Sequence, residues 1–330
     1  MRVSVLGAGG WGTAFARLLA LNGHEAKLWA RDPDAARILD ATRENPAYLP
    51  GVRLPRERLE ITSRLSRAMA EETVVLAVPS FAMPALLERI APRSSPDKVF
   101  ISLTKGIDRA SRRTMSELID AGASHRAVFA LSGPSHAEEV GRDLPTAVVL
   151  AGTDLGLGKA LQHALATPRF RVYLTDDIRG VELCAALKNV IALASGASDG
   201  LGFGDNSRGA LITRGLAEMV RFGRHLGVRE ETLFGLSGLG DLVATCTSDH
   251  SRNRLVGYRL GRGEPLDAIL SGMKMVAEGV YAARIVHEMA DEARIDMPIT
   301  QAVWRLLEGG VDPGALVDEI MTREPKREGL

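Results

Sequence analysis

The stretch MRVSVLGAGGWG, residues 1–12, decides the fold of this chain. It joins an apolar run to the pattern G-x-G-x-x-G, and a segment with helical apolar spacing follows. A short strand that enters a helix through such a turn aims backbone N–H groups and the helix dipole at a pyrophosphate. Gly7 permits the turn, Gly9 lets the phosphates approach, and Gly12 lets the helix pack closely against the strand. We therefore predict a dinucleotide-binding turn, with a merely structural glycine-rich turn as the alternative.

Length, charge and composition narrow the class of protein. The chain has 330 residues, which suggests about two domains with a large core. Its formal net charge is zero, so we expect neither nucleic acid nor an anionic membrane as a partner. No apolar stretch approaches the roughly 20 residues of a spanning helix, and no signal peptide is apparent. The two cysteines have no C-x-x-C partner, so a reduced cytoplasmic protein is expected. Cys184 and Cys246 lack metal-ligand spacing, and we predict no metal site.

Apolar segments in the first half of the chain are typical of buried strands. They cover residues 25–30, 74–78, 99–103, 127–131, 146–151 and 170–174, and helix-like segments separate most of them. This alternation predicts an α/β fold with a Rossmann-like, doubly wound, mostly parallel sheet. Ligands of such sheets bind beyond the carboxyl ends of the strands, so we expect site residues in the segments that follow them.

From about residue 176 the pattern becomes helical. Residues 181–197, 210–226, 279–293, 299–307 and 313–321 have the apolar spacing of helices. We predict a dinucleotide-binding Rossmann-like domain over residues 1–176 and an all-helical, substrate-binding and catalytic domain over residues 177–330. Asp176 and Asp177 are candidates to cap the helix that joins the two.

The pair Arg31-Asp32 lies at the end of the second strand segment, about 20 residues beyond the glycine turn, where a dinucleotide fold selects its cofactor. An acid there binds the ribose 2′-hydroxyl of NADH, and an arginine attracts the 2′-phosphate of NADPH. Because both residues are present, we predict that NADPH is favoured and that NADH is also used. The alternative is a solvated ion pair in which Asp32 starts a turn before Pro33.

Lys188 lies in a segment, residues 181–193, that is apolar on nearly every face. A helix of this kind is buried, and a polar group inside it is costly without partners. Desolvation lowers the pKa of a lysine, which suits proton exchange with a substrate oxygen. The chain has only seven lysines against 34 arginines, so a lysine at this place favours a functional role. The alternative is a lysine whose ammonium group reaches water.

Two later segments contain candidate polar groups. Asp241 follows a glycine-rich apolar segment, interpreted as a loop, and could orient Lys188 or a substrate hydroxyl; the alternative is a helix N-cap. Ser251, Arg252 and Asn253 place a guanidinium between short polar donors, which suits a phosphate. A solvated basic turn is the alternative for this second segment.

Further motifs follow the glycine turn in a fixed order. They are NPAYLPG at 45–51, TKG at 104–106, SGPSHAEEV at 132–140, LKNV at 187–190, DGLG at 199–202, LGDL at 239–242, TCT at 245–247, SRNR at 251–254 and VAEGV at 276–280. As an ordered set, this sequence closely resembles the soluble bacterial NAD(P)-dependent glycerol-3-phosphate dehydrogenases, from residue 1 to about residue 310. The resemblance implies interconversion of dihydroxyacetone phosphate and sn-glycerol 3-phosphate, which feeds phospholipid synthesis.

The resemblance also implies roles for individual residues. Lys188 is the expected general acid or base, Lys105 a second cation near nicotinamide and substrate, and Asp241 the group that holds Lys188. The substrate is expected at Lys105, Gly133, Ser135, Lys188, Asp241, Ser251, Arg252 and Asn253. The cofactor is expected at Gly7, Gly9, Gly10, Trp11, Gly12, Arg31, Lys105, Ala137, Arg252, Val276 and Glu278.

Two other functions compete with this interpretation. One is a β-hydroxy-acid dehydrogenase of the same two-domain architecture, which the phosphate-suited residues Ser251–Asn253 disfavour. The other is a regulatory protein that senses NAD(P)H without turnover, which the apolar setting of Lys188 disfavours. The oligomeric state stays open, with a homodimer as one of the states considered.

Overall fold

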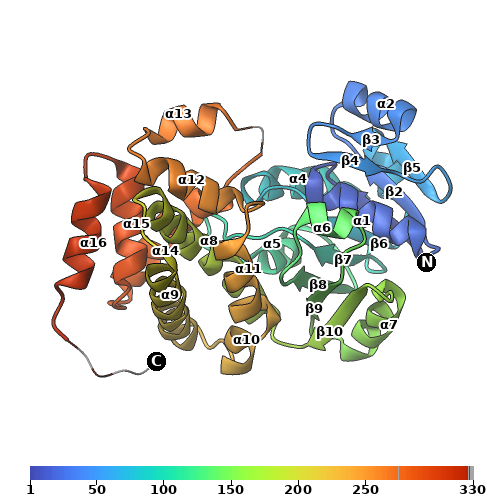
Figure 1. The fold of residues 1–330 in the computed structure, drawn as a ribbon. Coiled ribbons are helices and arrows are strands. Elements are labelled where there is room, and N and C mark those ends of the chain that lie inside the picture. Colours follow the sequence, from blue (N-terminus) through green and yellow to red (C-terminus); the bar gives the residue numbers. More distant parts are fainter. Residues whose placement is uncertain (274, 326, 328–330) are drawn as a thin grey trace. The chain divides into compact units, whose positions relative to one another are not determined.

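The glycine-rich turn follows a central strand of an eight-stranded sheet (Figure 1). The structure is a computed structural model and describes residues 1–273, 275–325 and 327. The strands are β1 (Arg2–Leu6), β2 (Glu25–Trp29), β5 (Leu59–Thr62), β6 (Thr73–Leu76), β7 (Val99–Ser102), β8 (Ala127–Ser132), β9 (Thr146–Ala151) and β10 (Phe170–Thr175). All neighbouring pairs are parallel except β8 with β9, so the predicted mostly parallel sheet is confirmed.

The strand order places the turn at the point where the winding of the sheet reverses. The order is β10-β9-β8-β7-β6-β1-β2-β5, so the chain moves outward from β1 through β2 to β5 and then returns to β6 on the other side of β1. In open α/β sheets, ligands bind beyond the carboxyl ends of the strands at such a reversal. The loops that follow β1 and β6 are therefore the expected ligand-binding edge of this sheet.

Alternating side chains of the strands pack into apolar clusters on both faces of the sheet. Val3 and Val5 join a cluster with α1 (Gly10–Leu21), α2 (Pro33–Thr42), α6 (Ala137–Gly141) and α7 (Leu155–Leu165). Leu6 joins a second cluster with α3 (Leu65–Ala68), α4 (Met83–Ile90) and α5 (Met115–Gly122). Strand side chains alternate between faces, so burial on both faces explains the continuous apolar runs in the sequence.

Two parts of this first unit were not predicted from the sequence. One is strand β5, and the other is a small antiparallel hairpin of β3 (Glu44–Asn45) and β4 (Leu49–Arg53). Both consist of short strands, and the hairpin strands alternate buried with exposed residues irregularly. Short strands of this kind lack the sustained period of two that identifies a strand in a sequence.

The remaining chain is helical, as predicted. Its helices are α8 (Ile178–Gly200), α9 (Asp205–His225), α10 (Glu230–Phe234), α11 (Asp241–Thr247), α12 (Arg252–Gly261), α13 (Leu266–Ser271), α14 (Glu278–Glu292), α15 (Pro298–Glu308) and α16 (Pro313–Met321). The compact units are Met1–Glu182 and Leu183–Leu330, so the division falls within the first turns of α8, whereas the predicted boundary precedes this helix. Asp177 caps the start of α8, because its Oδ1 accepts a hydrogen bond from Gly180 N at 3.0 Å.

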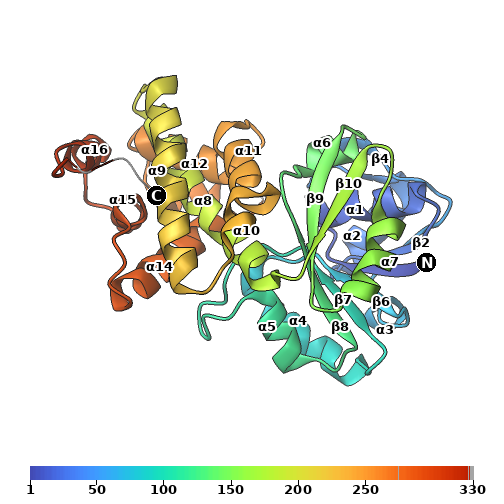
Figure 2. The ribbon, with the colours of Figure 1, turned by 90° about the horizontal axis from the view of Figure 1, so that it is seen from below.

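Helix α8 corrects one expectation from the sequence. An 18-residue window of it has a mean hydropathy of 1.3, and the helix is long and apolar enough to cross a membrane by length and composition. Of that window, 94% is buried inside the protein, where α9, α11, α12 and α14 adjoin it (Figure 2). The prediction that no apolar stretch approaches the length of a membrane-spanning helix is therefore wrong for α8. The burial identifies α8 as a core helix.

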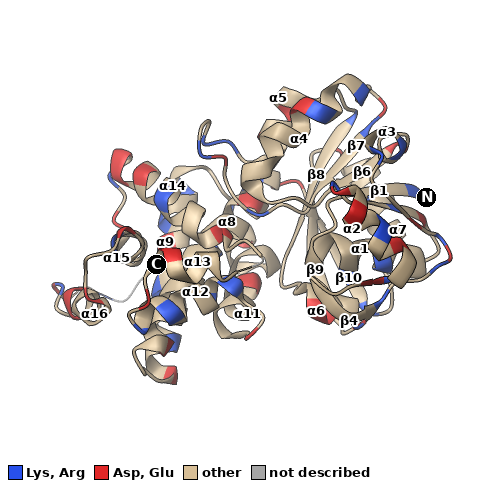
Figure 3. Cartoon of the chain, turned by 90° about the horizontal axis from the view of Figure 1, so that it is seen from above, with Lys and Arg blue, Asp and Glu red and all other residues tan. Residues whose placement is uncertain are grey.

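Charged residues of both signs are interspersed along the described elements of each unit (Figure 3), in keeping with the formal net charge of zero. Two carboxylates are instead buried at helix N-termini. Glu182 accepts hydrogen bonds from the backbone N and the Oγ of Ser116 in α5. Glu218 accepts from Ile299 N, Thr300 N and Thr300 Oγ1 at the start of α15. Burial raises the pKa of each carboxyl to about 7, against the hydrogen bonds, which lower it.

The raised pKa of Glu218 predicts a pH dependence of stability. The folded state binds this proton more tightly than the unfolded state, so the stabilisation is fully present below the unfolded pKa of 4.5 and is lost as the pH rises through about 7. Glu218→Gln removes this titration and should flatten the fall in unfolding free energy over that interval, measured by urea denaturation. Glu231→Gln, at an exposed site, serves as the control. If the unfolding free energy falls equally steeply with pH in wild type and in Glu218→Gln, the raised pKa of Glu218 is contradicted.

Candidate active site

The glycine-rich turn has room for a ligand on one side and close backbone contacts on the other. Gly7 has φ +122°, and a Cβ there would stand 2.4 Å from the carbonyl oxygen of Ala77, the residue after β6. A Cβ on Gly12 would stand 2.0 Å from Gly7 O, so the helix can begin this close only with glycine. A Cβ on Gly9 would meet no atom within 4 Å. The turn thus leaves open the side on which a pyrophosphate would bind the N-terminus of α1.

Arg31 and Asp32 differ in what their side chains contact. The Oδ1 of Asp32 accepts a hydrogen bond from Asp34 N at 2.9 Å and caps α2, with Pro33 in the first turn. Asp32 therefore starts a helix where the alternative from the sequence expected a turn, and the ion pair with Arg31 stays a prediction. Arg31 is exposed at the end of β2, the strand that also accepts a hydrogen bond from Gly7 N at Trp29 O, 3.1 Å away.

Lys105, Gly133 and Ser135 lie together beyond the carboxyl ends of β7 and β8. Lys105 Nζ is 3.3 Å from Gly133 O, and Ser135 Oγ donates to the same carbonyl at 2.9 Å. The structure thus brings three of the predicted substrate-binding residues into one hydrogen-bonded group. Ala137, the first residue of α6, lies beside Gly10, since a Cβ on Gly10 would stand 3.6 Å from its methyl group.

The helical unit buries an ammonium group against a carboxylate. Lys188 Nζ is 2.6 Å from Asp241 Oδ1 and 2.7 Å from Thr245 Oγ1, and Lys188 is only 4% exposed. Thr245 also donates to Asp241 O at 2.6 Å. Desolvating two charges is costly, and leaving either one buried alone costs about 3–5 kcal/mol. The predicted partnership of Lys188 and Asp241 is therefore present as a tight, buried ion pair.

The segment before Asp241 differs from its prediction as a loop. Residues Leu236–Gly240 form a π-helical turn that leads directly into α11. A Cβ on Gly238 would stand 1.9 Å from Leu233 O, so glycine permits the turn to fold back on α10. Asp241 is the first residue of α11, with Gly240 as the N-cap, so the alternative of Asp241 as an N-cap does not hold. π-turns are often found at functional sites, and this one sets the position of a carboxylate.

The segment Ser251–Asn253 forms the N-terminus of α12. Ser251 Oγ caps the helix by accepting from Arg254 N at 3.2 Å, while Arg252 is exposed in its first turn. Asn253 is buried, accepts from Gly279 N at 2.9 Å and donates to the Oδ1 of Asn189 at 2.8 Å. Asn253 therefore connects the residue after Lys188 with the first turn of α14.

Val276 and Glu278, the remaining predicted cofactor residues, lie at that same end of α14. Both are half-buried, and Glu278 is its first residue. Two polar residues of the site, Thr245 and Asn189, were not among the predicted site residues. Thr245 lies one helical turn after Asp241, a spacing that places both side chains on one face of a helix. That signal becomes available only once residues 241–247 are known to be helical.

Other features of the described residues carry no comparable chemistry. Cys184 and Cys246 are buried thiols without a disulfide bond, and burial raises the pKa of Cys246 to about 12. No group of three or more His, Cys, Asp or Glu side chains suited to a metal ion occurs among residues 1–273, 275–325 and 327.

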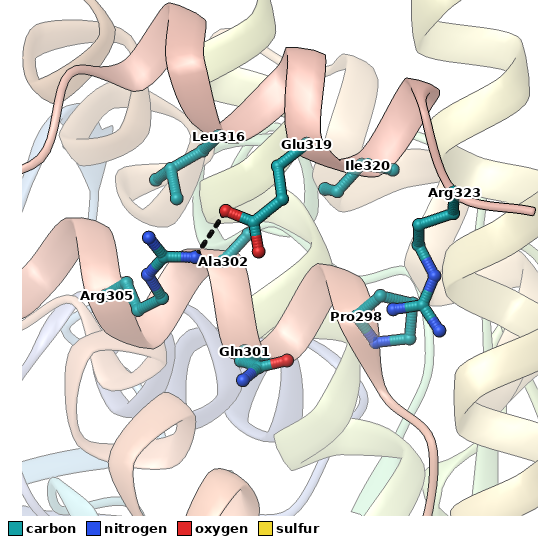
Figure 4. Close-up of a pocket in the computed structure, with 8 residues that line it drawn as sticks. All are labelled: Pro298, Gln301, Ala302, Arg305, Leu316, Glu319, Ile320 and Arg323. Carbon is teal, nitrogen blue, oxygen red and sulfur yellow. Dashed lines mark hydrogen bonds and ion pairs between the residues drawn. The ribbon is translucent and has the colours of Figure 1, made fainter.

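A small groove lies between α15 and α16 (Figure 4). Two arginines line it, and each is paired with an acid. Arg305 pairs with Glu319 at 2.6 Å, and Arg323 pairs with Asp296 at 2.8 Å. We assign this groove no part in the site.

Comparisons with known proteins identify the same enzyme family for both units. Residues 2–157 match the family profile for the N-terminus of NAD-dependent glycerol-3-phosphate dehydrogenase, and residues 177–318 match that for its C-terminus. The chain is 48% identical to the NAD(P)+ glycerol-3-phosphate dehydrogenase of Nitratidesulfovibrio vulgaris, over 99% of this chain and 100% of that protein. It is 45% identical to the enzyme of the same description from Pelotomaculum thermopropionicum, over 98% of this chain and 93% of that protein.

Solved structures show the same similarity. The crystal structure of a glycerol-3-phosphate dehydrogenase from Coxiella burnetii has a TM-score of 0.93 at 40% identity, over 98% of this chain and 99% of that chain. A D-mandelate dehydrogenase has a TM-score of 0.66 at 13% identity, over 96% of this chain and 99% of that chain, and is similar in fold alone.

Proposed function

Because this chain belongs to the NAD-dependent glycerol-3-phosphate dehydrogenase family, we propose that its buried Lys188 exchanges the proton in the reaction of that family. The enzyme is an oxidoreductase that interconverts dihydroxyacetone phosphate and sn-glycerol 3-phosphate with NAD(P) as its cofactor. The observation that carries the proposal is the buried ion pair between Lys188 on α8 and Asp241 on α11, whose Nζ and Oδ1 atoms are 2.6 Å apart. A regulatory sensor without turnover has no need of such a pair.

In the reducing direction, Lys188 donates a proton to the C2 oxygen of dihydroxyacetone phosphate. When bound, NAD(P)H supplies the hydride that adds to C2. Negative charge then develops on the C2 oxygen, and a nearby ammonium group stabilises and protonates it. In the reverse direction the neutral amine of Lys188 removes the hydroxyl proton. Asp241 and Thr245 fix Nζ in position, because both bind it from α11.

The phosphate group of the substrate is proposed to bind at the start of α12. A helix N-terminus attracts an anion, and Arg252 adds a guanidinium in the first turn. Ser251 and Asn253 flank Arg252 with further polar groups. Lys105 is proposed as a second cation, and Gly133 and Ser135, which contact one another, as further substrate contacts.

The cofactor is proposed to bind at the turn of Gly7, Gly9, Gly10 and Gly12, where an open side at Gly9 leaves room for the pyrophosphate. Trp11 and Ala137 of the sheet unit, and Val276 and Glu278 of the helical unit, are proposed as further cofactor contacts. Residues 1–176 then act as the dinucleotide-binding domain and residues 177–330 as the catalytic domain. We further propose cytoplasmic operation in phospholipid metabolism and retain the homodimer as a prediction, to be tested by mass measurement in solution.

Lys188→Met should lower kcat by about 10³-fold, because general acid–base groups contribute about 10²–10⁴-fold to the rate. Methionine keeps the volume of the side chain while removing the proton. The Kd for NADPH should stay unchanged. The measurement is loss of NADPH absorbance with dihydroxyacetone phosphate, and Lys159→Met, on the exposed part of α7, is the matched control. Wild-type turnover in Lys188→Met would remove Lys188 from the mechanism.

The choice between NADPH and NADH is proposed to favour NADPH. Because the carboxylate of Asp32 caps α2, it is occupied by a backbone N–H and does not need a ribose hydroxyl as its partner. Arg31, exposed beside it, supplies positive charge for a 2′-phosphate. Both cofactors remain usable, since the capping role of Asp32 does not prevent the ribose of NADH from binding beside it.

Arg31→Ala should lower the preference for NADPH over NADH by about tenfold, since a hydrogen bond to a charged group contributes about 1.5–3 kcal/mol. The measurement is the ratio of the two kcat/KM values. Arg37→Ala removes another arginine of this region, one that pairs with Asp34, and should leave the ratio unchanged. An unchanged ratio in Arg31→Ala would place recognition of the 2′-phosphate on other groups.

A further inference from the structure

The motif NPAYLPG has no role in the chemistry described so far, yet its first residue contacts the glycine-rich turn. Asn45 ends β3 and is only 3% exposed. Its Nδ2 donates to Ala8 O at 2.9 Å and to Thr13 Oγ1 at 2.8 Å. Ala8 lies between the first two glycines of the turn, and Thr13 lies in the first turn of α1. One buried amide therefore joins the two parts of the chain that would surround a pyrophosphate.

The hydrogen bond to Ala8 O fixes the orientation of the peptide group between Ala8 and Gly9. In a trans peptide the C=O and N–H bonds point in opposite directions. Since the carbonyl of Ala8 points toward Asn45, the N–H of Gly9 points away from it. A rotated peptide would instead present a carbonyl oxygen where the N–H now stands, and that oxygen would repel a phosphate. Asn45 therefore selects the donor-outward form of a flexible, glycine-flanked peptide.

The hairpin that holds Asn45 is itself tied to the elements around the turn. The carbonyl oxygen of Tyr48 would stand 2.7 Å from a Cβ on Gly10, so the hairpin lies directly against the start of α1. Leu49 and Val52 pack against Gly141 in α6, where a Cβ would be 3.1 Å from Val52 Cγ2. These contacts fix Asn45 relative to both helices.

Arg17, on α1, adds polar contacts to this arrangement. Its Nε donates to Arg53 O at 3.1 Å, and its two terminal nitrogens bind the carboxylate of Asp143. Arg53 ends the hairpin and Asp143 follows α6, so this one guanidinium joins α1 to both. The hairpin is thus a fixed support and not a free loop.

We propose that Asn45 is a positioning residue for the cofactor pyrophosphate, acting through Ala8 and Thr13. The inference rests on the proposed cofactor site at the glycine-rich turn. Asparagine suits the position because its amide nitrogen has two hydrogens to donate. Aspartate has the same shape but offers no donor when ionised, faces two acceptor oxygens, and adds negative charge beside the phosphates.

The test is isothermal titration of the full chain with NADPH and with ADP, which carries the pyrophosphate without nicotinamide. Asn45→Ala should raise both Kd values by about tenfold, since two hydrogen bonds of about 0.5–1.5 kcal/mol each are lost. Asn45→Asp should raise them further. At saturating NADPH, kcat and the KM for dihydroxyacetone phosphate should stay at wild-type values, because Asn45 positions the cofactor turn alone.

Asn22→Ala is the matched control. Asn22 follows the other end of α1, and its amide also donates to two carbonyl oxygens, those of Ala164 and Ala166. It should lower the melting temperature of the apoprotein without changing either Kd. Thr13→Val removes the hydroxyl that accepts from Asn45, keeps the shape of the side chain, and should raise both Kd values severalfold. This variant keeps the inference testable if Asn45→Ala fails to fold.

Wild-type Kd values in Asn45→Ala or in Thr13→Val would overturn the inference and leave the proposed function intact. A wild-type chain that binds neither NADPH nor ADP would overturn the proposed cofactor site together with it.

Discussion

A lysine ammonium buried in an apolar helix is the constraint on which the helical unit depends. Helix α8 is surrounded by other helices, so Lys188 cannot keep its hydration and needs protein partners. Asp241 and Thr245 supply them from α11, which begins at a π-turn that only glycine-rich sequence permits. The same burial that makes the ammonium costly makes its interaction with a developing negative charge strong. The structural cost of Lys188 and its proposed catalytic use therefore have one physical origin.

The sheet unit meets a different constraint, since a turn proposed to bind phosphate must present its N–H groups before any ligand stabilises them. The turn has little side-chain material of its own, because glycines are required at Gly7 and Gly12 by backbone contacts. Its conformation is instead held by neighbours, among them the backbone of β2 and the amide of Asn45. Preorganisation of this kind reduces the conformational entropy that the turn loses when the cofactor binds.

Much of the fold could be predicted from the sequence, because parallel strands buried on both faces give continuous apolar runs. Residues 146–151, for example, were predicted as a strand and coincide with β9. The hairpin could not be predicted, because its strands are too short to show a sustained period of two. The π-turn could not be predicted either, because its glycines are equally typical of a loop. The pairing of Lys188 with Asp241 was one of the roles considered for Asp241 from the sequence, and the family resemblance implied it. The contact of Lys188 with Thr245, which joins residues 57 apart in the chain, was not predicted. No periodicity in the sequence reports such a packing contact between two helices.

The most direct measurement is a crystal structure of the full chain with NADP+ and sn-glycerol 3-phosphate. The proposed mechanism predicts that Lys188 Nζ lies at hydrogen-bond distance, about 2.6–3.2 Å, from the C2 hydroxyl oxygen of the substrate. It also predicts that Nζ keeps its contact with Asp241. A complex in which Nζ binds the phosphate group, or lies beyond reach of C2 while another side chain contacts that oxygen, would contradict the assignment of Lys188 as the proton-transfer group.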